Sequence, residues 1–336
     1  MKRLLAHETR ESARSGARRC GSFGTGVISK RNLLQRVLPA IVSAVTLGWV
    51  VASFDMSELQ RVLSWRVAGV LVPGLLLYGA ITLVLEAYSI LSLTGRRPGF
   101  GAWTAARVKC ASYLLAIVNY FLGGAALTIL LRRRAGLGLG ETASVVLLIF
   151  AVDVVVVLGL GALGAALAGP EGPAVRTSFA ALAGAGFFGG MILLRTPRSL
   201  GPLERVRSLT VFDALRRTPS RALLELGALR LIFSVCFVAI GGVAFAAFGV
   251  PVPPGRLILG MLTLAIVGAL PIAVAGLGTG QVAAVYVFQG VATPETLIAL
   301  SLVLSAGLIL LRAGMGLLFA REFTREALQE ARAEAA

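Results

Sequence analysis

The chain of 336 residues is 57% hydrophobic and only 14% charged, which is typical of polytopic helical membrane proteins rather than soluble domains. Its formal net charge is +16, but the arginines stand in blocks between apolar segments, the pattern that orients membrane proteins, so we expect no nucleic-acid partner. One histidine and three widely spaced cysteines predict neither histidine-based catalysis nor a metal site. We therefore expect no enzyme activity and no cofactor.

The chain opens with a basic segment, residues 1–36, that holds nine Lys or Arg against two Glu. This composition predicts a disordered cytoplasmic tail. The transmembrane domain is expected over residues 37–320, and a cytoplasmic tail over 321–336. Six apolar segments are long enough to cross a bilayer: 37–54, 67–93, 141–168, 174–194, 222–248 and 297–320.

Two further apolar segments are interrupted near their middle. Residues 108–131 contain a break at 119–124, and residues 257–292 contain Pro271 and a glycine-rich break at 276–281. A helical Gly costs about 1 kcal/mol and a Pro about 3 kcal/mol, so neither segment is expected to be one helix. Broken backbone at membrane depth is tolerated where it is buried in protein or lines a cavity. Both segments are therefore predicted to be re-entrant helical hairpins.

Re-entry of the first hairpin from the cytoplasm keeps the basic residues 132–134 and the basic loop 195–222 on the same, inner side. Each half, 37–168 and 174–320, then reads as two spans, a hairpin and a span. Because each half crosses the membrane an odd number of times, three, the two halves have opposite orientations. Transporter folds with a site at the bilayer midplane share this inverted repeat. The expected fold is an all-α polytopic membrane protein with about six spans and two re-entrant hairpins in an inverted repeat, both termini cytoplasmic.

The breaks suggest a binding site because a helix that restarts there presents unpaired N–H groups and a positive dipole end. Such ends, expected after Gly123-Gly124 and after the second break, suit an anionic group such as a phosphate. The alternative is that the glycines only permit close helix packing. The candidate substrate-binding residues in the breaks are Asn119, Gly123, Gly124, Pro271, Gly276, Gly278, Thr279, Gly280 and Gln281.

Asp153 and Arg312 complete the candidate site. Each lies within a predicted span, where an ionised side chain costs about 2.5–3.5 kcal/mol and so faces an interior with partners. They occupy similar places in the two halves, and a purely structural ion pair is the alternative to a substrate role. Snorkelling explains four charged residues nearer the inner interface: Glu86, Lys109, Glu225 and Arg230.

These features together resemble the lysylphosphatidylglycerol synthase transmembrane-domain family, the flippase-like half of multiple peptide resistance factors. The resemblance covers about 34–321 and rests on the first break with its arginine triplet, Asp153, Pro271 with the following glycines, and Arg312. The sequence departs from the family pattern where Leu122 replaces an expected Pro, and where Ala125 and Gln281 replace expected acidic residues.

The resemblance implies a protein of the inner (plasma) membrane that moves a lipid between leaflets. The lipid classes it implies are an anionic or aminoacylated phospholipid, a polyprenyl phosphate, or a related lipid. Two alternatives stay open: a secondary transporter of a small polar solute, and a non-transporting partner of a lipid- or envelope-biosynthetic enzyme. Anionic head groups are expected at the basic cytoplasmic loops. The sequence does not indicate an oligomeric state.

Overall fold

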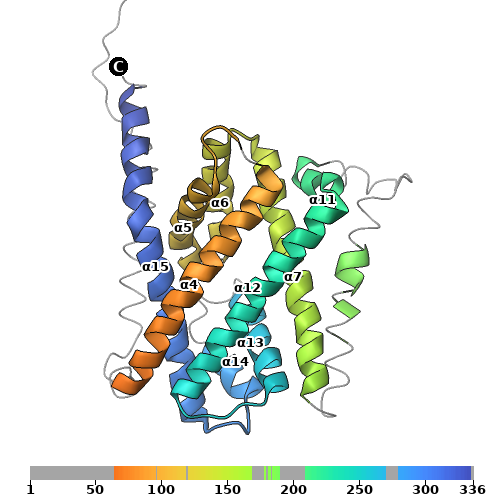
Figure 1. Ribbon diagram of the computed structural model, residues 1–336, viewed down its shortest axis with the longest axis vertical. Coiled ribbons are helices and arrows are strands. Elements are labelled where there is room, and N and C mark those ends of the chain that lie inside the picture. The colour runs from red at the N-terminus through yellow and green to blue at the C-terminus, as the bar shows by residue number, and fades with distance from the viewer. Residues whose placement is uncertain are drawn as a thin grey trace, which may run out of the picture. The chain divides into compact units, whose positions relative to one another are not determined.

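The computed structural model describes residues 64–95, 97–118, 120–168, 178, 181–182, 184–189, 209–269 and 279–333. These residues belong to one unit, Gly48–Ala336. Within this part of the chain the regular structure is entirely helical, without a β-strand (Figure 1).

Among the described residues, four helices are long and apolar enough to cross a membrane. They are α4 (Trp65–Thr94), α7 (Leu139–Leu167), α12 (Ser220–Ala247) and the first part of α15 (Pro294–Ala333). Their bounds agree with four of the expected spans to within a few residues, apart from the longer α15. The expected span 37–54 lies outside the described residues, and 174–194 is described only in part, including the π-helix η2 (Ala185–Gly189).

The two interrupted segments form pairs of shorter helices: α5 (Ala102–Val118) with α6 (Tyr120–Ala135), and α13 (Pro254–Ala269) with α14 (Thr279–Val287). In the first pair, a Cβ added at Gly123 would collide with Ala116, so α6 folds back onto α5. In the second, a Cβ at Gly260 would collide with Phe288, which directly follows α14. Both interrupted segments are therefore helical hairpins.

The hairpins enter the helix bundle from opposite ends of α7 (Figure 1). At one end, Arg97 before α5 forms an ion pair of 3.9 Å with Glu141 in the first turn of α7. At the other end, Gly255 in the first turn of α13 packs directly on the backbone of Leu167. The short helices η3 (Thr210–Phe212) and α11 (Asp213–Arg217) lie on the first of these two ends of α7.

Each hairpin packs on the last long helix of the other half of the sequence. α13 packs on α7, and a Cβ at Gly164 would lie 2.7 Å from the backbone nitrogen of Leu259. α5 packs on α15, where a Cβ at Gly316 would lie 2.7 Å from Leu114. α4 and α12 pack on each other. Small residues thus allow the close backbone approach that drives helix association in membranes.

Two apolar clusters form the core. One lies around Ile90, Leu131 and Ile149, and the other around Phe245 and Phe288. Along α4 and α12, the residues between these clusters include the buried polar and charged side chains Thr82, Glu86, Arg230 and Ser234. The polar layer that carries the candidate site is therefore positioned by an apolar cluster on either side.

Replacing Gly164 by Leu is expected to destabilise the fold, because the added side chain would meet the α13 backbone. The matched control is Gly159→Leu in the same helix, where a Cβ would meet nothing within 4 Å. Thermal unfolding of both variants in detergent, followed by size-exclusion chromatography, measures the difference. Equal midpoints for the two variants would contradict the close α7–α13 contact.

Candidate functional site: a polar cavity above a buried ion network

A buried network of ion pairs connects four helices. Arg230 of α12 is 1% exposed and places Nη2 2.9 Å from Oε2 of Glu86 in α4. Lys109 of α5 lies 3.0 Å from the other oxygen of the same carboxylate. Arg230 also reaches Asp153 of α7, with 3.4 Å between Nη1 and Oδ2. Each carboxylate therefore has a cationic partner, as charges removed from water require.

The expectation that these residues snorkel to an interface is wrong for three of the four. Glu86 and Arg230 are buried and Lys109 is nearly so, whereas Glu225 is exposed. The physical reason is that the partners come from other helices, so no residue of the network needs to reach water. The signal available in the sequence was Glu86 itself, an acidic residue well inside a predicted span.

A cavity of about 550 Å³ lies next to this network. Its walls come from all four long helices and both hairpins, and most of them are apolar. Its polar lining consists of Tyr78, Thr82, Glu86, Lys109, Ser112, Tyr113, Tyr120, Asp153, Ser234, Ser301, Ser305 and Arg312. This combination of apolar walls and a few convergent polar groups is characteristic of ligand sites.

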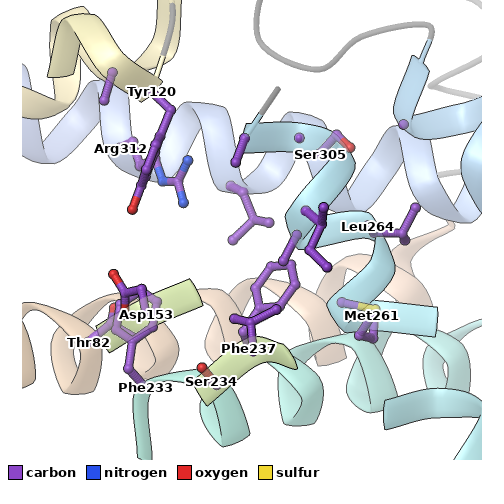
Figure 2. Close-up of a pocket in the computed structure, with 18 of the residues that line it drawn as sticks. Thr82, Tyr120, Asp153, Phe233, Ser234, Phe237, Met261, Leu264, Ser305 and Arg312 are labelled. Carbon is purple, nitrogen blue, oxygen red and sulfur yellow. The ribbon is translucent and has the colours of Figure 1, made fainter. Parts of the chain in front are cut away.

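Asp153 and Arg312 both line the cavity but lie on opposite sides of it. Figure 2 shows Arg312 beside Tyr120 at one wall, with Asp153 and Phe233 across the open space. The ion pair of Asp153 is with Arg230 rather than Arg312. Among the described residues, no carboxylate lies within ion-pair distance of Arg312. Its electrostatic contacts are with tyrosines of the same wall.

Gly123 and Gly124 also line the cavity, from inside α6. Because α6 begins at Tyr120, its unpaired N–H groups precede these glycines, and the expectation that they follow them is wrong. A Cβ at Gly124 would lie 2.8 Å from Phe150 of α7, and Gly123 packs against α5. Both glycines thus serve close helix packing.

The second hairpin presents a helix start to the same space. α14 begins at Thr279, and Gly280 in its first turn lines the cavity with open space where a Cβ would stand. Gln281 is buried and lines a separate groove with Tyr286 instead. The remaining candidates lie outside the described residues: Asn119, Pro271, Gly276 and Gly278.

Three tyrosines of the cavity wall were not predicted from the sequence: Tyr78, Tyr113 and Tyr120. Tyrosine is common at membrane interfaces, so its presence in an apolar segment carries no specific signal. Tyr120 also stacks on Phe150, with 4.8 Å between ring centroids. In the described part of the chain, no group of His, Cys, Asp and Glu could hold a metal ion.

Asp153→Asn combined with Arg230→Gln should show energetic coupling, because Arg230→Gln alone leaves Asp153 without its cationic partner, whereas in the double variant no carboxylate is left there. Contacting residues couple by about 0.5–3 kcal/mol in double-mutant cycles. We expect less coupling between Asp153→Asn and Arg312→Gln, whose side chains face each other only across the cavity. Unfolding free energies in detergent provide the measurement. Additive effects for the Asp153–Arg230 pair would contradict the network.

Comparison with known proteins agrees with this architecture. The chain matches the model of the family described as the lysylphosphatidylglycerol synthase TM region over residues 36–311. A comparison with curated proteins finds no match. The family match and the membrane-length helices together indicate a multi-pass membrane protein with a lipid-related function. Because the matched region covers most of the chain, the protein belongs to the lysylphosphatidylglycerol synthase transmembrane-region family.

Proposed function

We propose that this protein is a lipid flippase-like transporter without enzyme activity, and that the cavity holds the lipid head group during transfer. The observation that carries the proposal is a polar layer, with Arg312 on one wall and Asp153 on the other, enclosed between two apolar clusters. Acyl chains require apolar surroundings and a head group requires polar ones. The cavity offers both within one space.

The exposure of two residues in the cavity wall supports a lipid over a soluble substrate. Phe121 of α6 and Val154 of α7 line the cavity, yet each is 57% exposed. Val154 lies near the middle of the 29-residue α7, far from either helix end. An opening at this depth would face the hydrocarbon core of a bilayer, where acyl chains remain while a head group enters.

The helix pairing supports an inverted repeat with two re-entrant hairpins. α7 packs on the hairpin of the second half, α15 packs on that of the first, and the equivalent helices α4 and α12 pack on each other. This reciprocal exchange is the contact pattern expected of two inverted halves. Rocking one half against the other would then open the cavity to alternate leaflets. The same architecture fits lipid movement down its concentration gradient and lipid movement coupled to an ion.

The alternatives make different demands on the cavity. A partner that only stabilises a biosynthetic enzyme has no need of a cavity of about 550 Å³ with a charged lining. A transporter of small polar solutes would be expected to open toward water at a helix end. Lipid transfer therefore accounts for more of the observations, and the solute transporter is the second candidate.

Orientation is the first test. We propose a location in the inner (plasma) membrane with both termini cytoplasmic, because Arg132, Arg133 and Arg134 end α6 on the side where α11 lies. In a cysteine-free background, Arg134→Cys should resist an impermeant thiol reagent applied to intact cells, whereas Glu295→Cys should react. Reaction of the Arg134 position from outside would contradict the re-entrant first hairpin.

Blocking the cavity is the second test. Gly280→Leu places a side chain in open cavity space without a clash, so we expect folded protein that has lost lipid movement. The control is Gly159→Leu, whose Cβ also meets nothing and which does not line the cavity. Leaflet-resolved movement of fluorescent phospholipids in proteoliposomes is the readout. Full activity of folded Gly280→Leu protein would contradict the proposed site.

A further inference from the structure

The charges around the cavity do not balance. Lys109, Arg230 and Arg312 supply three positive charges, and Glu86 and Asp153 supply two negative ones. Lys109 and Arg230 form the ion pairs of both carboxylates, so the excess positive charge lies on Arg312. Within the described residues, no other Asp, Glu, Lys, Arg or His side chain lines the cavity.

Arg312 is also placed for recognition rather than for structure. Its guanidinium is half-buried at the cavity wall and lies in the field of three tyrosines, Tyr78, Tyr113 and Tyr120. A guanidinium presents planar N–H donors that match the oxygens of a phosphate, and phenol hydroxyls add further donors. Thr82 and Ser234 lie across the cavity and can bind hydroxyl groups (Figure 2).

We propose that the head group carried by this cavity is a phosphodiester with one net negative charge, bound at Arg312, rather than a zwitterionic or an aminoacylated, cationic one. The inference rests on the proposed function and selects among its substrate classes. A ligand with one negative charge neutralises the cavity. A head group that ends in an ammonium would instead bring a second cation into a low-dielectric space already in positive excess, which is unfavourable.

The apolar end of the cavity accommodates the rest of such a lipid. Phe237, Met261 and Leu264 lie together, away from Arg312 (Figure 2). A phosphodiester at Arg312 would therefore place its glycerol and first acyl carbons against these side chains. This arrangement distinguishes a lipid from a free phosphate ester, which gains nothing from the apolar end.

The experiment compares three fluorescent lipids in proteoliposomes containing the full chain: phosphatidylglycerol, phosphatidylethanolamine and lysyl-phosphatidylglycerol. We expect phosphatidylglycerol to move roughly 10- to 100-fold faster, the range that one charge-assisted hydrogen-bonding site supplies. Arg312→Gln should abolish this preference and Arg312→Lys should retain part of it. Arg217→Gln, at a side chain 80% exposed on α11, is the matched control and should behave as the parent protein.

The outcomes separate the two proposals. Movement of lysyl-phosphatidylglycerol or phosphatidylethanolamine at an equal or higher rate would overturn the inference and leave the lipid-transfer function standing. Absence of movement of every lipid would overturn the proposed function. Strong inhibition by soluble glycerol phosphate, with uptake of that ester into the vesicles, would assign the phosphate site to a solute and overturn the inference. An unchanged preference in folded Arg312→Gln protein would also overturn it.

Discussion

Arg230 is almost completely buried among four helices, and its ion pair with Glu86 makes this burial possible. Removing one member of a buried pair typically costs about 3–5 kcal/mol, because the other charge is left without a partner. Glu86 also forms an ion pair with Lys109, and Arg230 forms one with Asp153. These ion pairs connect α4, α5, α7 and α12 at one depth in the helix bundle. The network thereby sets where Glu86, Lys109 and Asp153 stand in the cavity wall.

The network also determines which charges remain for a substrate. It neutralises both carboxylates within the cavity wall and leaves Arg312, on the separate helix α15, with neutral tyrosine neighbours. The packing of the helices therefore determines which charges are paired. Small residues bring α7 against α13 and α15 against α5, and the hairpins close the ends of the polar layer without filling it.

The positions of the long helices could be predicted from the sequence, because length and apolarity are local properties. The segments 67–93 and 222–248 correspond to α4 and α12 with shifts of only a few residues. The hairpins were indicated by glycine and proline, which disfavour helix wherever they stand. The pairing of Arg230 could not be predicted, because Glu86 lies 144 residues away in the chain and only helix packing brings the two together. The partner of Asp153 could not be predicted for the same reason. Its pairing with Arg312 was expected from their similar places in the two halves, but its partner is Arg230.

The first break shows a finer limit of sequence reasoning. The two glycines mark the hairpin correctly, but the helix begins at Tyr120, ahead of them, since Gly123 is needed where α6 crosses Ala116. A glycine that breaks a helix and a glycine that permits a crossing look alike in sequence. Similarly, nothing local distinguishes Tyr120 in the cavity wall from a tyrosine at a membrane interface.

The location of a bound head group tests the role of the cavity most directly. Phosphatidylglycerol carrying a photoactivatable group on its head group can be crosslinked to the purified protein, and the labelled peptides sequenced. We expect labelling of cavity residues on α5, α6 and α15, near Tyr113, Tyr120 and Arg312. The Gly280→Leu variant should lose this labelling. Labelling confined to exposed residues, such as Ile232 and Val235 of α12, would contradict a head-group site in the cavity.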